Sequence, residues 1–221
     1  MSRSRPRTAP APALLPRPSL PHSSSPPAAS LPAFDFSLHV QRVCADMCTR
    51  LAELAHIDIG RVAVAVRRAR KRVPHGLQAS LTPLRFAGGS LVTENARGRW
   101  TIQRVYEAPG GREFLYILNF YLPRFLNQPL EEKLVTIVHE LWHIGPVCDG
   151  DLRRHEGRCY IHTGRQSQFD AWAGELSRKW LSLGPPAELF DFLRHNAHEL
   201  LGRYGSVAGT RIPSPRLIRA A

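Results

Sequence analysis

The sequence lacks any apolar run long enough to cross a bilayer, which argues against a protein anchored by membrane-spanning helices. It is also poor in cysteine, with four in 221 residues: Cys44, Cys48, Cys148 and Cys159. Their spacing matches no pair of zinc knuckles, and a chain of this length needs no disulfide framework. We therefore expect reduced thiols, a cytoplasmic protein and no membrane partner.

Acidic residues are absent before Asp35, whereas proline, serine and arginine are abundant there. The apolar cluster APALLP is short and interrupted by prolines, so it makes a poor secretory signal. An acid-poor, arginine-rich start also suits an organelle transit peptide, but the prolines disfavour the amphipathic helix of such peptides. The lack of apolar periodicity predicts a disordered tail over residues 1–33.

The charge balance is strongly basic, with a net charge of +12 and a pI near 10.5. This balance favours acidic partners, of which nucleic acid is the first candidate. The strongest basic run outside the tails is RRARKR, and the residues that would contact phosphates non-specifically are Arg67, Arg68, Arg70, Lys71 and Arg72. Trp100 and Tyr106 are candidates for base stacking or for ordinary sheet positions, and the basic run itself is equally consistent with a solvated strand end.

Apolar periodicity predicts the elements of the first half of the chain. Apolar residues at steps of three and four predict a helix over residues 36–54, and alternating valines predict a strand over 61–70. The turn signal PGG joins two strand-like segments, so residues 99–107 and 113–121 are interpreted as a hairpin. The second of these strands is apolar on both faces and should be central.

Helices dominate the second half. A helix is predicted over 129–144, where proline and two glutamates suit the first turn and Gly-Pro ends it. A third helix is expected to begin at 167–170, and a fourth to cover 187–202. A disordered basic tail is expected over 205–221. These elements predict one α+β domain over 34–204 with a small, mostly antiparallel sheet.

The segment IVHELWHIG lies on the predicted helix and carries two histidines four residues apart. His139 and His143 should lie on one face, one helical turn apart, and can offer two imidazoles to one zinc ion. Glu140 lies about 100° around the helix from His139, which places its carboxylate near a metal-bound water rather than the metal. A metal-activated water and a carboxylate base are what a metallopeptidase requires. A surface helix with two chance histidines is the alternative.

A third ligand must come from the long polar loop that follows the helix. The loop offers Asp149, Asp151, His155 and His162. Positive neighbours disfavour His155 as a cation ligand, and the spacing alone leaves Asp149 and His162 level.

Several segments of the chain resemble a group of bacterial and phage metallopeptidases. These segments are LAHIDIGRV, LTPLRFAGGS, YILNFYL, VHELWHIGPVCDGDLRR and GRCYIH, within about residues 50–181. The group is a minimal zincin family akin to the SprT-like proteases. HExxH is shared by many zincins, and the following DGDLRR and GRxYxH make the resemblance more specific.

The resemblance implies a zincin-like fold with zinc bound by His139, His143 and His162, and with Glu140 as general base. Asp149 remains an alternative because the spacing in SprT-like enzymes is somewhat shorter. The DGD acidic pair would structure the loop or orient the histidines. Tyr160, Arg154 or the backbone of the edge strand would stabilise the oxyanion.

Two other clusters of potential ligands carry weaker signals. His195 and His198 are three residues apart in an order that matches neither known helical zinc signature, which favours a polar helix face. Cys148 and Cys159 flank the candidate loop ligands, but thiolates suit a structural site better than hydrolysis.

The sequence thus predicts a zinc-dependent metallopeptidase. A DNA-associated SprT-like protease, acting on proteins held on nucleic acid, keeps the same chemistry and adds a partner. A non-catalytic binding module stabilised by the metal is the alternative from another class.

Overall fold

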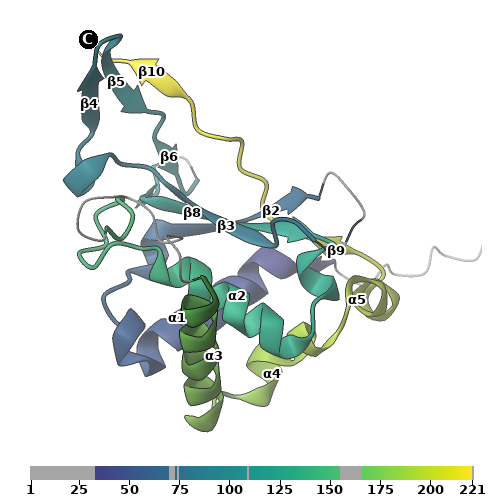
Figure 1. Ribbon diagram of the computed structural model, residues 1–221. Coiled ribbons are helices and arrows are strands. Elements are labelled where there is room, and N and C mark those ends of the chain that lie inside the picture. The colour runs from purple at the N-terminus through teal and green to yellow at the C-terminus, as the bar shows by residue number, and fades with distance from the viewer. Residues whose placement is uncertain (1–32, 70–72, 74, 109, 155–165, 221) are drawn as a thin grey trace, which may run out of the picture. The chain divides into compact units, whose positions relative to one another are not determined.

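The computed structural model describes residues 33–69, 73, 75–108, 110–154 and 166–220 (Figure 1). Within them, the α-helices are α1 (Phe36–Arg50), α2 (Leu130–Trp142), α3 (Gln166–Ser182), α4 (Ala187–Phe190) and α5 (Ala197–Tyr204). The strands are β1 (Phe34–Asp35), β2 (Val62–Arg68), β3 (Ala79–Pro83), β4 (Val92–Asn95), β5 (Gly98–Ile102), β6 (Val105–Tyr106), β7 (Glu113–Phe114), β8 (Tyr116–Leu122), β9 (Val207–Ala208) and β10 (Leu217–Arg219). The expected α+β class is confirmed. The predicted N-terminal tail lies outside the described residues except for Ala33.

The main sheet has the strand order β2-β8-β3. β8 is central, as its two apolar faces predict, and Tyr116 to Phe120 are all buried. β3 pairs with it antiparallel, but β2 pairs with it parallel, with Val62 opposite Tyr116. The expectation of a mostly antiparallel sheet is therefore only half right here. A parallel neighbour requires a long connection, and the 47 residues between β2 and β8 include β3 itself.

The predicted hairpin of 99–107 with 113–121 is mostly wrong. Across the PGG turn only β6 and β7 pair, with Val105 opposite Phe114. β5 instead joins β4 and β10 in a separate antiparallel sheet. The turn residues fix where the chain reverses. The apolar strand β8, however, gains more free energy of burial between β2 and β3 than it would beside the polar segment 99–104.

The first helix is shorter than predicted. Asp35 caps α1 by accepting a hydrogen bond from the Leu38 backbone N–H at 3.1 Å, and Val40, Val43 and Met47 are fully buried. The helix ends at Arg50, and a short 3₁₀ helix, η1 (Ala52–Leu54), continues the chain. The stripe of apolar residues persists through both, which is why the sequence alone does not show the break.

The predicted helix over 187–202 is divided into α4, the 3₁₀ helix η5 (Asp191–Arg194) and α5. Asn196 starts α5 with a capping box: its side chain accepts from the backbone N–H of Glu199, and the Glu199 carboxylate accepts from the Asn196 N–H. A capping residue favours a new helix start over continuation of the previous helix.

The C-terminal segment is not the disordered tail predicted over 205–221. β9 pairs parallel with β1, with Phe34 opposite Val207, and β10 pairs antiparallel with β5. Between these strands, the Val66 backbone N–H donates to the Thr210 carbonyl at 2.8 Å. The domain therefore extends past the predicted boundary at 204.

The cysteines that the structure describes are free thiols: Cys44, Cys48 and Cys148. Burial raises the pKa of the Cys48 thiol to about 12, which favours the inert protonated form. Cys159 lies outside the described residues. In the part of the chain that the structure describes, no helix is both long and apolar enough to cross a membrane.

A buried lysine joins α2 to the C-terminal helices. Lys133 is 1% exposed, and its ammonium group donates to the carbonyls of Leu193 and His195, each at 2.8 Å. Burial lowers the pKa of Lys133 to about 8. The charged form is therefore disfavoured in the folded state relative to the unfolded chain.

We expect Lys133 to make the stability of the fold depend on pH above 8. Between pH 8 and the ordinary lysine pKa of 10.5, the unfolded state binds the additional proton. The free energy of unfolding of the wild type, minus that of Lys133→Met, should rise with pH there, by at most about 1.4 kcal/mol per pH unit. Urea unfolding at a series of pH values measures this difference. A difference that stays constant or falls over this window would contradict the assignment.

Candidate metal centre

Helix α2 carries the candidate ligands because its other side is committed to the core. Leu134, Ile137, Val138 and Leu141 are all fully buried. The helix follows Pro129 and has two glutamates in its first turn, where the dipole favours negative charge. This packing fixes the rotation of the helix, so that the histidine-bearing side faces strand β3.

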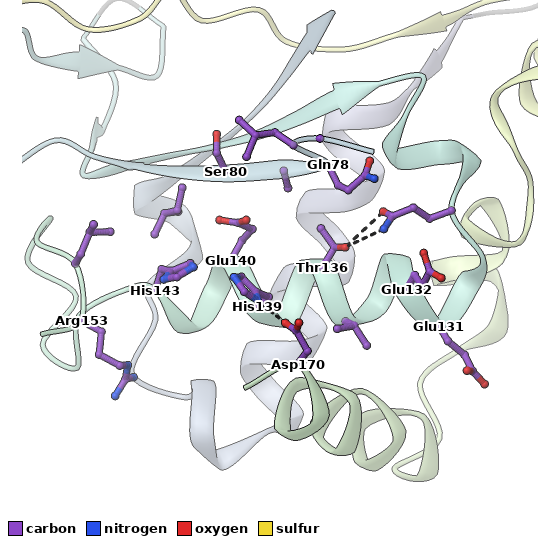
Figure 2. A pocket seen from close by; sticks show the side chains of 17 residues that line it. Gln78, Ser80, Glu131, Glu132, Thr136, His139, Glu140, His143, Arg153 and Asp170 are labelled. Carbon is purple, nitrogen blue, oxygen red and sulfur yellow. Dashed lines mark hydrogen bonds and ion pairs between the residues drawn. The ribbon is translucent and has the colours of Figure 1, made fainter. Parts of the chain in front are cut away.

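The two histidines and the intervening glutamate lie close together. The imidazole rings of His139 and His143 have centroids 4.8 Å apart. One potential ligand atom from each of His139, Glu140 and His143 lies within 4.8 Å of the other two. Figure 2 shows the three side chains on the side of α2 that faces the β3 strand. The described residues therefore contain a group that can hold a metal ion.

Glu140 occupies an unusually apolar environment for a carboxylate. The residue is 9% exposed, and burial raises the pKa of its side chain to about 7. A hydrogen bond from the backbone N–H of Leu81 acts to lower this pKa, but its effect is smaller than that of burial. A carboxyl group with a pKa near neutrality can both accept and return a proton at physiological pH. This is the property expected of a general base, and the sequence alone did not reveal it.

Helix α3 packs against α2, and two side chains near its start lie beside the histidines. The Phe169 ring packs against His139, with centroids 4.7 Å apart, and against His143 at 6.2 Å. The Asp170 carboxylate lies 3.4 Å from Nδ1 of His139 (Figure 2). A carboxylate on Nδ1 orients the imidazole and leaves Nε2 for a metal.

A cavity of about 990 Å³ opens over the ligands, between α2 and β3. β3 is an edge strand whose described partner is β8. The Tyr121 backbone N–H donates to the Gln78 carbonyl directly opposite, so alternate residues, Ala79 and Leu81, direct their backbone groups away from β8. Both residues line the cavity.

The loop after α2 folds back on the main sheet. The Tyr116 hydroxyl accepts from the Gly150 N–H and donates to the Asp151 carbonyl, both at 2.9 Å. Gly150 has a φ of 98°, and a Cβ there would lie 2.4 Å from a side-chain carbon of Arg85, so this turn requires glycine. The Arg153 N–H then donates to the His143 carbonyl at 2.8 Å, which returns the chain to the end of α2.

The described residues give different outcomes for the four loop candidates. Asp149 is not part of the ligand group: its carboxylate accepts from the Asp151 N–H at 3.0 Å and lies against Gly89. Asp151 structures the loop, because its carboxylate accepts from Gly88 N–H and pairs with Arg154 at 2.7 Å. His155 and His162 lie outside the described residues.

The other predicted positions do not converge on this site. The His195 imidazole lies near Asp191, Glu199 and Arg203 at the surface, which matches a polar helix face. Cys148 packs against the core and is absent from the ligand group found among the described residues. Arg154, an oxyanion candidate, pairs with Asp151; Tyr160 and Cys159 lie outside the description.

The sequence interpretation missed the relation of Phe169 and Asp170 to the histidines. The sequence placed both residues only in the expected start of the third helix, at 167–170. The available signal was a carboxylate near the start of the helix that follows the candidate loop, since metal-binding histidines require an orienting acceptor. No spacing rule connects Asp170 to His139, because the contact is set by the packing of α3 on α2.

Comparison with known protein families, with curated proteins and with solved structures finds no match for this chain.

We expect Asp170→Asn to weaken metal binding at this site by about tenfold or more. The amide removes the negative charge beside Nδ1 of His139 while nearly preserving shape. Competition with a chromophoric zinc chelator measures the affinity. Glu175→Gln is the matched control, because Glu175 is an exposed carboxylate on the same helix. Equal affinities for the two variants would show that Asp170 does not orient the ligand.

Tyr116→Phe should destabilise the fold by about 2 kcal/mol, because the buried Gly150 N–H loses its acceptor. The Asp151 carbonyl loses one of its two donors and keeps the Gly145 N–H. Tyr121→Phe is the control: its hydroxyl lies 3.4 Å from the Ser80 hydroxyl near the surface. Thermal unfolding compares the two. If Tyr116→Phe lowers the stability no more than Tyr121→Phe does, the proposed anchoring of the loop is refuted.

Proposed function

We propose that this chain is a zinc-dependent metallopeptidase with a zincin-like fold. The observation that carries the proposal is the convergence of His139, Glu140 and His143 beneath an open cavity bordered by an edge strand. Each part has a role in peptide hydrolysis: the histidines bind the metal, the glutamate moves protons and the strand holds the substrate.

The residues present fit a zinc ion by their chemistry. Two imidazoles one helical turn apart and an orienting carboxylate at Asp170 form the usual beginning of a catalytic zinc site. A catalytic site needs three protein ligands and one open position. Zinc held there supplies a Lewis acid that lowers the pKa of a water molecule and polarises a peptide carbonyl.

Glu140 would act as the general base. Its carboxylate accepts a proton from the attacking water and transfers it to the departing amine, which requires a pKa near the working pH. In the metal-free protein, the apolar surroundings raise the Glu140 pKa to about 7. A cation beside the carboxylate lowers that pKa, so burial compensates for the charge of the metal.

The edge strand β3 would bind the substrate backbone. The backbone groups of Ala79 and the Leu81 carbonyl, directed away from β8, match those of an extended peptide, which can add as a further strand. The Leu81 N–H is already engaged with the Glu140 carboxylate. This mode selects for extended polypeptide and imposes few demands on side chains. Leu81 lies near Glu140, so a peptide paired there passes the proposed base.

His162 is the proposed third ligand. Support comes from the described residues on either side of segment 155–165: Arg153 is hydrogen-bonded to the His143 carbonyl, and Phe169 contacts both imidazoles. Described residues before and after segment 155–165 therefore lie beside His139 and His143. Asp149, the alternative, is engaged with Gly89 and the Asp151 N–H instead.

Elemental analysis of protein purified without chelators tests the metal and its ligands. We expect about one zinc per chain in the wild type, and loss of zinc in His139→Ala and His162→Ala. His155→Ala and Asp149→Ala are the matched loop controls and should retain it. Absence of stoichiometric metal from the wild type would remove the proposal, and loss only in Asp149→Ala or His155→Ala would reassign the ligand.

Glu140→Gln should retain zinc and lose peptidase activity by at least about a hundredfold. Proteolysis of an unfolded protein such as casein, followed by mass spectrometry, provides the assay. A non-catalytic module predicts instead that the wild type and Glu140→Gln are equally inactive while chelation lowers the melting temperature of both. Cleavage only when the protein substrate is bound to DNA would favour the nucleic-acid-associated protease.

A further inference from the structure

A second cavity, of about 1170 Å³, adjoins the cavity over the candidate metal ligands. Both cavities are lined by Gln78, Gln128 and Glu132, so they form one continuous depression. Figure 2 shows Gln78 and Glu132 on the side of His139 that is away from His143. The cleft proposed above for the substrate therefore continues past the start of β3 into a second hollow.

The junction of the two cavities lies a few peptide units from the proposed general base. Gln78 comes three residues before Leu81, whose N–H contacts the Glu140 carboxylate, and this separation is about 10 Å of extended chain. Glu132 comes eight residues before Glu140, which is about 12 Å along the helix. Both estimates place the second cavity about three to four substrate residues from the bond that would be cleaved.

The second cavity combines two arginines with apolar walls. Arg68 ends β2 and Arg124 follows β8. The Arg124 guanidinium donates to the carbonyls of Val73 and Leu77, at 3.1 and 2.8 Å, which hold it beside the cavity. Arg68 is exposed and forms no ion pair with a carboxylate of the described residues. The apolar lining residues are Val73, Pro123, Pro129, Ala197 and Leu201. Apolar walls reduce the screening of an anion by water, so they strengthen its attraction to the arginines.

The charge of the lining residues changes sign along this cleft. The first cavity is lined by one arginine, Arg153, and by four carboxylates: Glu131, Glu132, Glu140 and Asp170. In the second cavity, two arginines outnumber the single carboxylate of Glu132. An acidic side chain of a bound peptide is therefore favoured in the second cavity and disfavoured beside the carboxylates of the first.

The basic run RRARKR contributes one residue to the second cavity. Arg68 lines it, whereas the Arg67 guanidinium donates to the Asn119 side chain and to the Ile212 carbonyl, at 2.7 and 3.3 Å. Arg67 therefore supports the segment that leads to β10. The other members of the run lie outside the described residues: Arg70, Lys71 and Arg72.

We propose that the second cavity is a specificity subsite for an acidic side chain of the substrate, about three to four residues from the cleaved bond. In this role the subsite rests on the peptidase function proposed above. Two guanidinium groups suit a carboxylate, because charge-assisted hydrogen bonds from arginine to carboxylate are strong. The substrate class is thus an extended polypeptide with an aspartate or glutamate at this distance and without acidic residues next to the cleaved bond.

The test is the binding of fluorescent peptides to the full-length Glu140→Gln chain, which should bind without cleaving, measured by anisotropy. Peptides of about twelve residues are long enough to span both cavities at about 3.3 Å per residue. They consist of alanine, serine and leucine, and they carry two glutamates, two glutamines or two lysines at one end. Each pair is placed at either end in turn, because a strand can add to β3 in either direction.

We expect one of the glutamate peptides to bind about threefold or more tightly than its glutamine counterpart, which is the scale of one or two exposed ion pairs. The lysine counterpart should bind more weakly than both. Introducing Arg68→Gln should abolish this preference, and Arg68→Glu should reverse it. The control Arg42→Glu makes the same charge change at an exposed position of α1 that lines neither cavity, and it should preserve the order. Thermal unfolding verifies that each variant is folded.

Equal binding of the three kinds of peptide, no binding of any of them, or the same change of preference in the Arg68→Glu and Arg42→Glu variants would overturn the subsite.

Cleavage of a mixed peptide library by the chain with Glu140 intact separates this inference from the peptidase function. Products should be enriched in aspartate and glutamate about three to four residues from the new terminus, on one side of the cleaved bond. Cleavage without this enrichment would refute the subsite and leave the peptidase proposal standing. A preference for the glutamate peptide in binding, together with no cleavage of any peptide, would support the acidic site and overturn the peptidase proposal instead.

Discussion

The rotation of helix α2 about its own axis is the constraint on which the site depends. Four apolar side chains of the helix are fully buried, at positions 134, 137, 138 and 141. With that stripe committed to the core, the remaining side is the one that carries His139 and His143 toward β3. Glu140 lies at the border between the two, and it is consequently both buried and directed at the cavity. The packing of α2 thus places two candidate metal ligands and one carboxyl group with a raised pKa on the same side of the helix.

The second requirement is that distant segments meet at the end of this helix. The Tyr116 hydroxyl, placed by the central strand, holds the loop at Gly150 and Asp151. Helix α3 brings Phe169 and Asp170 to the imidazoles. These contacts come from three elements that are far apart in the sequence. Their common effect is to restrict the imidazole rings before any ligand arrives, which reduces the entropy lost on binding.

Local sequence patterns predicted the parts of the fold that depend on local physics. The α2 boundaries, the central position of β8 and the histidine pair follow from periodicity, from turn residues and from helical spacing. Pairing over long distances could not be predicted in the same way. The parallel β2–β8 pair, the separation of β5 from β8 and the return of β9 and β10 each result from competition between segments for the same partner. The Asp170 contact and the Glu140 pKa depend on that assembled packing, so no local rule reveals them.

The pairing of β1 with β9 defines where the folding unit ends. Phe34 opposes Val207, and its ring also packs against Phe192 and Tyr204. Phe34, near the start of the domain, is therefore held by residues near its C-terminal end, so the two boundaries of the domain stabilise each other. A truncation chosen from the helical pattern, ending at 204, would expose this aromatic cluster and leave β5 with one neighbour. The autonomous unit is better delimited by strand partners than by the last helix, and its C-terminal residues belong to the fold.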